Sequence, residues 1–284
     1  MARLKEQRGD CPVCGYANAY AETITRDGKR LGWCASCQDK DAITAHLRGS
    51  GESAHRAVGM SASIVQDRAD KIAKAKERAR VIWSGSEAVT ADTPAGQYLT
   101  SRGLGYLIGN AALRYRADCS HPDGKRYPAM VALVVDVTGQ PLGVHRTYLT
   151  TDGHKARVEP VKASIGPMSG GVIRLGPIAS EIVVGEGIES AASAGKMLNL
   201  PAWAARAAGN LETSLYLPDA VQRIVIAADN DGINAQGHNP GIEAAEAAAR
   251  RWKAEGRTVK ILKPDQPGQD FNDVLMRYNR EAAL

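Results

Sequence analysis

Residues 223–232 restrict the fold most strongly, because a short apolar run ends abruptly there in acidic residues. Residues 224–228 are uninterrupted and rich in β-branched side chains, which predicts a strand buried on both faces, as in a parallel sheet. Asp229 and Asp231 follow it, where ligands bind in open α/β sheets. Two such carboxylates repel each other unless a cation lies between them. Oxygen ligands without nearby His or Cys favour Mg²⁺ or Mn²⁺, although an acidic surface turn is the alternative interpretation.

Two further acidic clusters follow predicted strands. Residues 181–185 form a second short apolar run, which ends at Glu186. Asp270 and Asp273 follow a third predicted strand over residues 259–262. We expect the three clusters to converge, because the carboxyl ends of parallel strands meet at one edge of a sheet.

The order of these acids resembles that of the Toprim domain. The motifs Glu186-Gly187, Asp229-x-Asp231-Gly232 and Asp270-x-x-Asp273 carry the resemblance, which covers about residues 179–284. Toprim domains occur in DnaG-type primases, in type IA and type II topoisomerases and in some nucleases. The resemblance implies that Glu186, Asp229 and Asp231 are catalytic. It also implies that these acids hold Mg²⁺ or Mn²⁺ together with Asp270 or Asp273, and that Glu186 acts as an acid or base.

One position departs from the DnaG-type pattern. That family places an Asp four residues after the first Glu, but here the position is Ser190, and Glu189 comes one residue earlier. Glu189 is then either a further acid beside the metal site or a residue of a helix N-terminus, favoured by the helix dipole.

Four of the five cysteines form two Cys-x-x-Cys pairs, which predicts a small zinc ribbon over residues 1–48. The predicted zinc ligands are Cys11, Cys14, Cys34 and Cys37. Disulfides are the weaker alternative in a cytosolic protein. The module resembles the ribbon that precedes the catalytic core of DnaG-type and satellite-phage primases. It would either bind single-stranded template or serve only as a folded cap.

The middle of the chain is predicted to be a mixed α/β subdomain. Residues 49–63 are rich in Gly, Ser and Ala and indicate a linker, and residues 64–89 indicate a basic helix. Residues 64–178 are assigned to this subdomain, which resembles the N-terminal catalytic subdomain of phage- and plasmid-borne Toprim primases. The motifs that carry the resemblance are Thr93-Pro-Ala, Tyr98-Leu-x-x-Arg-Gly103, Tyr127-Pro-Ala-Met130 and His145-Arg-Thr-Tyr-Leu149.

Residues 127–136 and 141–149 are predicted to be two strands of a hairpin. Four cations that flank this hairpin are predicted to contact substrate phosphates, because Arg and Lys pair with phosphate oxygens. They are Arg146, Lys155, Arg157 and Lys162, and the last three are assigned to a polar loop. Ordinary surface charge is the alternative for each of them.

Charge is divided unevenly along the chain. The formal net charge is +5, with 25 Lys and Arg against 17 Asp and Glu in residues 1–178, and 11 against 14 in residues 179–284. A basic part joined to an acidic catalytic part suits a polyanionic substrate. No apolar run approaches the roughly 20 residues of a membrane span, and we expect a cytoplasmic protein.

The sequence therefore predicts an α/β protein with a Toprim domain of parallel-type sheet and flanking helices. We expect a DNA primase, a nucleotidyltransferase that makes short primers on single-stranded DNA from nucleoside triphosphates. No ATPase motif is visible, so a separate replicative helicase is a candidate partner. The alternatives are a Toprim-type metal-dependent nuclease and a non-catalytic single-stranded DNA-binding replication protein.

Overall fold

The structure, a computed structural model, describes residues 6–9, 11–13, 20–24, 30–34, 43–44, 46–47, 62–235 and 237–282. The chain divides into two compact units, residues 1–71 and 72–284, which are described separately. The predicted linker over residues 49–63 lies almost entirely outside the described residues.

The first unit contains a three-stranded antiparallel sheet. Its strands are β1 (Glu6–Gly9), β2 (Tyr20–Ile24) and β3 (Arg30–Cys34), in the order β1-β2-β3. The β2–β3 hairpin follows the first cysteine pair, and its last residue is Cys34 of the second pair. Leu31 and Trp33 are exposed on β3, whereas Cys34 is buried.

The second unit is built around a five-stranded sheet in the order β13-β12-β10-β11-β9. The strands are β9 (Ile173–Arg174), β10 (Glu181–Gly185), β11 (Ala202–Ala204), β12 (Arg223–Ala227) and β13 (Thr258–Leu262). All neighbours are parallel except β11 and β9. The parallel-type sheet predicted from the apolar runs is confirmed.

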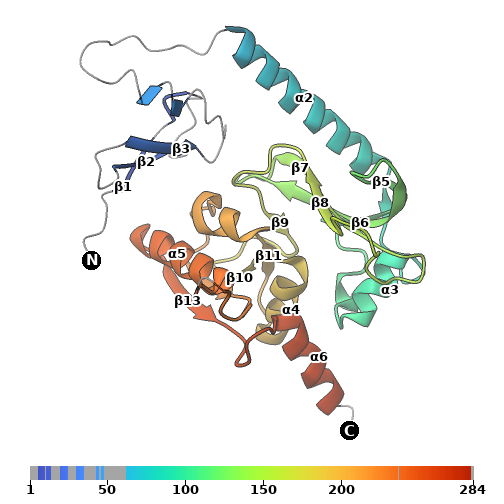
Figure 1. The fold of residues 1–284 in the computed structure, drawn as a ribbon. Coiled ribbons are helices and arrows are strands. Elements are labelled where there is room, and N and C mark those ends of the chain that lie inside the picture. Colours follow the sequence, from blue (N-terminus) through green and yellow to red (C-terminus); the bar gives the residue numbers. More distant parts are fainter. Residues whose placement is uncertain are drawn as a thin grey trace. The chain divides into compact units, whose positions relative to one another are not determined.

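Helices cover both faces of this sheet (Figure 1). They are α4 (Ile188–Leu198), α5 (Pro240–Ala254) and α6 (Phe271–Glu281), with a π-helical turn η2 (Asn210–Ser214). Because side chains alternate across a strand, Val183 and Val225 pack on the side of α4 and α6, whereas Ile182 and Ile224 pack on the side of α5. This burial on both faces explains the uninterrupted apolar runs.

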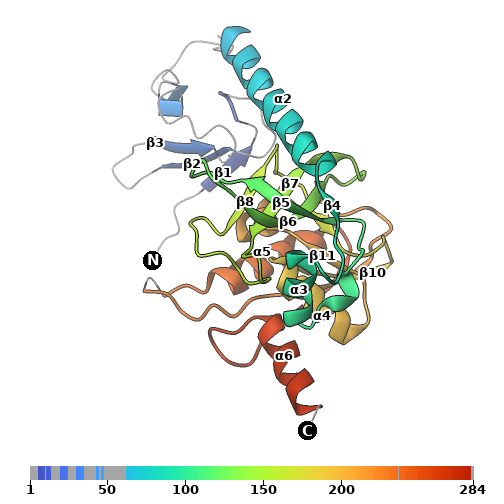
Figure 2. The same cartoon turned by 90° about the vertical axis from the view of Figure 1, so that its right-hand side faces the viewer.

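A second five-stranded sheet is antiparallel, in the order β4-β5-β6-β7-β8. Its strands are β4 (Glu87–Ala88), β5 (Leu113–Ser120), β6 (Arg126–Val135), β7 (Pro141–Tyr148) and β8 (Lys162–Ile165). Helix α3 (Pro94–Ser101) and the 3-10 turn η1 (Gly105–Leu107) join the core that this sheet shares with α4 and α6. Helix α2 (Ala62–Ser84) packs on the opposite face, through Ala79 and Ile82 (Figure 2).

Two sequence predictions in this region are wrong in detail. The helix predicted over residues 64–89 ends at Ser84, where Arg116 donates to the carbonyls of Val81 and Ile82, and residues 87–88 instead form strand β4. The predicted polar loop after β7 contains strand β8, which begins at Lys162. No helix of the described residues is long and apolar enough to cross a membrane.

Candidate active site

Glu186 and Asp229 lie at the same edge of the parallel sheet. Strands β10 and β12 are parallel neighbours with Gly185 opposite Ala227, so their carboxyl ends are level. Glu186 directly follows β10, and Asp229 comes two residues after β12. We refer to Glu186, Asp229, Asp231 and Asp270 together as the acid edge.

The carboxylates of the acid edge repel one another. Burial raises the pKa of Asp229 to about 6, the Ser190 hydroxyl opposes that rise, and Asp270, Glu186 and Asp231 add to it. Burial is also the main cause of the raised pKa of Glu186, followed by the charge of Asp231, while the charge of Lys162 opposes the rise. Removing these groups from water next to other acids disfavours their charged forms.

Ser190 orients one of these acids. Its hydroxyl is buried in the first turn of α4 and donates to Asp229 Oδ1 at 2.6 Å. At the position where the DnaG-type pattern has a carboxylate, this chain therefore has a hydrogen-bond donor to the neighbouring carboxylate.

Asp270 lies near the acid edge because the loop before it is hydrogen-bonded to the loop after β12. The backbone of Asn230 pairs with that of Gln269, with Asn230 N donating to Gln269 O at 3.1 Å. The Asn230 side chain also donates to the Pro264 carbonyl at 3.0 Å. Asp270 is thereby placed beside the loop that carries Asp229.

Asp270 and Asp273 also form the capping box of α6. Asp270 accepts from Asp273 N at 2.9 Å, and Asp273 accepts from Asp270 N at 3.1 Å. Burial raises the pKa of Asp270, and the charges of Asp273 and Glu189 contribute to that rise. Both carboxylates take part in the cap, but Asp273 is exposed, whereas Asp270 is half-buried and acts on the pKa of Asp229, so Asp270 is the better candidate of the two for a metal ligand.

The acid edge fits a Mg²⁺ or Mn²⁺ ion by its chemistry. Among the described residues, no three His, Cys, Asp or Glu side chains already stand together as a ready-made metal site. Mg²⁺ seldom uses such a cage, since it usually binds through one or two carboxylates, water and substrate phosphates. Carboxylates that lie close together and have raised pKa values are suitable ligands for it, because the ion offsets their repulsion.

Beside the acid edge, Glu189 binds two of the predicted phosphate-contacting cations. Lys155 Nζ lies 3.4 Å from Glu189 Oε1, and Lys162 Nζ donates to Oε2 at 3.1 Å. The Tyr98 hydroxyl donates to Oε1 at 2.6 Å. Glu189 and Tyr98 are residues whose roles the sequence analysis left open or missed.

Arg146 is placed differently from the lysines, and its prediction as a phosphate contact needs correction. Across the antiparallel sheet Thr147 pairs with Lys162, whereas Arg146 pairs with Val131, on the opposite face. Arg146 is buried, donates to the Ser120 carbonyl at 2.7 Å and lies over the Tyr148 ring. Neighbouring residues of a strand face opposite sides, so Arg146 cannot share the surface of Lys162.

Two other basic residues, Arg157 and Arg206, lie in segments that follow strands of the two sheets. Arg157 is exposed in the segment between β7 and β8. Arg206, which the sequence analysis missed, follows β11 at the acid edge with a φ of 75°, and its backbone N donates to Glu186 O at 2.7 Å. Burial lowers the pKa of Arg206 to about 10. A positive φ in a non-glycine residue beside a cluster of acids is typical of a functional site.

In the first unit, one cysteine from each predicted pair is buried in a small core. Cys11 and Cys34 pack there with Tyr20 and Ile43. Cys14 and Cys37 lie outside the described residues, so the zinc site stays a prediction.

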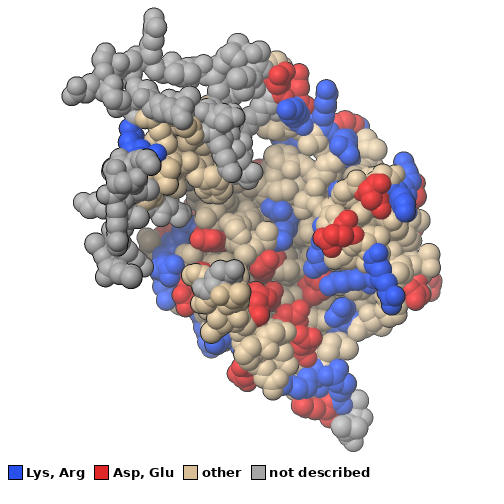
Figure 3. Space-filling view, viewed as in Figure 1, with Lys and Arg blue, Asp and Glu red and all other residues tan. Residues whose placement is uncertain are grey.

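Charged side chains are grouped on the surface of the molecule. In the space-filling view acidic side chains gather near the middle of the face, with basic side chains beside them (Figure 3).

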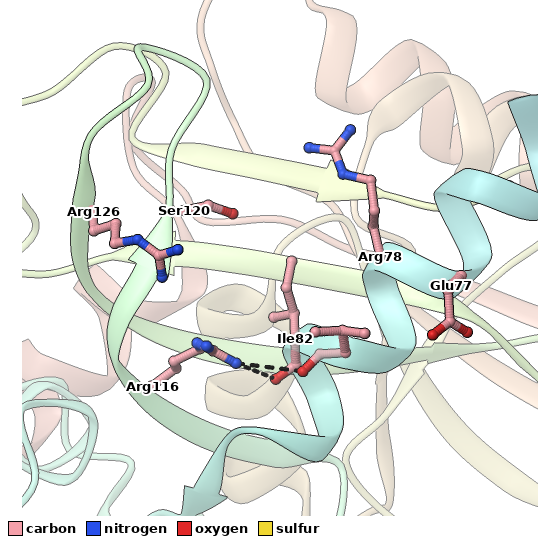
Figure 4. A pocket seen from close by; sticks show the side chains of 7 residues that line it. Glu77, Arg78, Ile82, Arg116, Ser120 and Arg126 are labelled. Atoms are coloured by element: carbon pink, nitrogen blue, oxygen red, sulfur yellow. Dashed lines mark hydrogen bonds between the residues drawn. The ribbon is translucent and has the colours of Figure 1, made fainter.

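A separate hollow lies at α2, β5 and β6 and is lined by Glu77, Arg78, Val81, Ile82, Arg116, Ser120 and Arg126 (Figure 4). Arg116 and Arg126 both bind Asp118, and Arg116 also caps α2. These arginines already have structural partners, and none of the acids of the acid edge lines this hollow.

Comparisons with known proteins assign families to both parts of the second unit. Residues 73–175 match the model of a domain of unknown function (DUF7146), and residues 181–281 match the model of the Toprim domain. No curated protein matches the chain significantly.

Similar solved structures include the E. coli primase catalytic core, with 16% identity over 67% of this chain and 71% of that chain and a TM-score of 0.43. The primase fragment of the bacteriophage T7 primase-helicase protein has 18% identity over 97% of each chain and a TM-score of 0.43. The RNA polymerase domain of Mycobacterium tuberculosis primase DnaG has 14% identity over 76% of this chain and 81% of that chain, with a TM-score of 0.44. Taken together, the matched family model, the parallel sheet and the order of the acids identify residues 181–281 as a Toprim domain.

Proposed function

We propose that this protein is a DNA primase that joins nucleotides on a single-stranded DNA template. The observation that carries the proposal is the acid edge of a Toprim domain lying beside a pair of partly exposed lysines. Transfer of a nucleotidyl group needs this combination, since metal and cations must both neutralise phosphate charge.

In this proposal the residues of the acid edge and the two lysines have different roles in the reaction. A divalent cation held by Asp229 and Asp231, with Asp270, would supply positive charge to the reacting phosphate and the attacking oxygen. Glu186 would accept the proton of the attacking 3′-hydroxyl, and its raised pKa favours that role. Lys155 and Lys162 would bind the outer phosphates of the nucleoside triphosphate.

The first unit would contact the template. Trp33 and Leu31 are 51% and 57% exposed on one strand, and aromatic side chains stack on unpaired bases. Zinc held by Cys11, Cys14, Cys34 and Cys37 would support this unit. Purified protein should then contain about one zinc per chain, and Cys34→Ser should lose it.

The proposal is tested by incubating the protein with single-stranded DNA, labelled nucleoside triphosphates and Mg²⁺ or Mn²⁺, and separating the products by size. Labelled oligonucleotides should form only when template, triphosphates and metal are all present. Asp229→Ala should abolish them. Asp219→Ala is the matched control, because Asp219 is an exposed acid before β12, at the other edge of the sheet.

The alternatives give different products. A nuclease would shorten the template without any triphosphate. A binding protein would retain template without changing it, and Asp229→Ala would leave that binding intact. Either result would replace the primase proposal.

A further inference from the structure

Glu189 is a buried carboxylate, and both of its oxygens contact polar side chains of this chain. Its side chain is 8% exposed and lies in the first turn of α4. Oε1 faces the Tyr98 hydroxyl at 2.6 Å and Lys155 Nζ at 3.4 Å, while Oε2 faces Lys162 Nζ at 3.1 Å. Both oxygens are engaged, so Glu189 is poorly placed to be a metal ligand.

The partners of Glu189 come from elements far apart in the chain. Tyr98 belongs to α3, Lys162 begins β8, and Lys155 lies in the segment before β8. Glu189 therefore joins the Toprim domain to the side of the antiparallel sheet that faces it. The two lysine side chains are 35% and 34% exposed, so the carboxylate lies inside and the ammonium groups lie at the surface.

The cluster has a net positive charge. Burial alone would raise the pKa of Glu189, but Lys162, Lys155 and Tyr98 hold it well below its usual range, so the carboxylate stays ionised. Burial and the neighbouring carboxylate raise the pKa of Tyr98, so the phenol stays neutral and donates. Within the cluster two ammonium groups face one carboxylate, and Lys162 also acts on the neighbouring Glu186. The positive charge in excess of Glu189 can attract an anion.

We propose that Glu189 is a positioning residue, which holds Lys155 and Lys162 side by side so that together they bind the phosphates of a nucleoside triphosphate. The proposal rests on the proposed function for the identity of the anion. In this proposal Glu189 holds the two lysine side chains and is not a ligand of the divalent metal ion.

A lysine side chain has considerable rotamer freedom, and fixing it before the anion arrives removes part of the entropy cost of binding. A shared carboxylate fixes two such side chains at once, in one orientation. The contact also accounts for an acid at position 189 in a chain that lacks one at position 190.

Glu189→Gln distinguishes positioning from a simple effect of charge. The substitution removes a negative charge near the bound phosphates, so electrostatics alone predicts tighter binding of ATP. Positioning predicts the reverse: the Kd for ATP in the presence of Mg²⁺ should rise about tenfold, the equivalent of one misplaced charge-assisted hydrogen bond. Glu189→Asp keeps the charge and should restore part of the affinity.

Two controls separate positioning from general damage to the fold. In a Lys155→Ala, Lys162→Ala background, adding Glu189→Gln should have no further effect, because Glu189 acts only through those lysines. A damaged fold would weaken binding in that background too. Glu181→Gln breaks the exposed Arg223 ion pair at the opposite edge of the sheet and should leave the Kd unchanged.

The outcomes distinguish this inference from the primase proposal. If the wild type binds ATP but makes no primers, the primase proposal fails, and the series of Kd values still tests Glu189. If Glu189→Gln binds ATP as tightly as the wild type or more tightly, or if its effect is additive with loss of the lysines, the positioning role is refuted. Failure of the wild type to bind ATP refutes it as well.

Discussion

Two carboxylates three residues apart, the half-buried Glu186 and the buried Glu189, differ in their electrostatic surroundings. Burial and Asp231 raise the pKa of Glu186 although Lys162 opposes the rise, whereas Lys162, Lys155 and a phenol lower the pKa of Glu189. Burial disfavours the charged form of both, so the partners decide the outcome. A carboxylate whose pKa stays raised among other acids is suited to bind a metal cation, and a carboxylate already paired with two lysines is suited to hold them in place.

The largest expected difference between the two regions is in catalysis. Asp229→Ala should reduce primer synthesis by about a hundred- to a thousandfold, because it removes charge stabilisation at the reacting phosphate. Glu189→Gln should cost about tenfold in the same assay at limiting ATP, through substrate binding. The rates of primer synthesis by the two purified variants test this prediction. Equal losses of rate would contradict the proposed difference between the acid edge and the Glu189 cluster.

Substitutions in the two regions should change the stability of the metal-free protein in opposite directions. Asp229→Asn removes a repelling buried charge and should raise the free energy of unfolding by about 1 kcal/mol. Glu189→Gln leaves two lysines without their partner and should lower it by about 2 kcal/mol, less than for a fully buried pair because both lysines are partly exposed. Urea unfolding in EDTA measures both, and changes of the same sign would contradict the account.

The pH dependence of stability should come from the acid edge. The pKa of Asp229 is about 6 in the folded state and 3.8 without the fold, so its favourable contribution is complete below pH 3.8 and is lost as the pH rises through 6. Glu189 behaves oppositely, with a contribution present above pH 4.5 and lost only as the pH falls through its lowered pKa. Between pH 7 and pH 5 metal-free wild type should therefore gain about 1 kcal/mol, and Asp229→Asn should gain less. Equal gains in the two proteins would argue against this assignment.

The smallest expected effect is on the salt dependence of binding, and it should differ between Lys162 and Arg146, which the sequence analysis predicts to have the same role. Lys162→Ala should weaken the salt dependence of ATP binding, that is, lower the slope of log Kd against log salt concentration, because one phosphate contact is lost. Arg146→Ala should leave the slope unchanged and act on stability, because its guanidinium is buried against Ser120 and Tyr148. A lower slope for Arg146→Ala would restore it as a phosphate contact.

The acid edge was predictable because its signal is local. Buried parallel strands leave continuous apolar runs, and acids that follow them must lie at one edge, so Glu186 and Asp229 could be assigned from the sequence. Two further features were present in the sequence but were not used. The capping box of Asp270 and Asp273 follows a known spacing, and the alternation of a strand separates Arg146 from its neighbours.

The cluster around Glu189 was not predictable in the same way. Its contact with Tyr98 spans 91 positions and its contact with Lys162 spans 27, so it arises from the packing of two sheets. Strand β8 has only four residues, with no clear alternation of buried and exposed side chains. Its placement therefore depends on pairing with β7, which sequence periodicity does not encode.

A titration of metal-free protein with Mn²⁺ tests the contrast between the two regions most directly. Calorimetry should show Mn²⁺ binding by the wild type, loss of that binding in Asp229→Asn, and wild-type affinity in Glu189→Gln. The account is contradicted if Mn²⁺ binding survives Asp229→Asn and is lost in Glu189→Gln. The metal would then bind at Glu189, the residue proposed to hold the two lysines, and not at the acid edge.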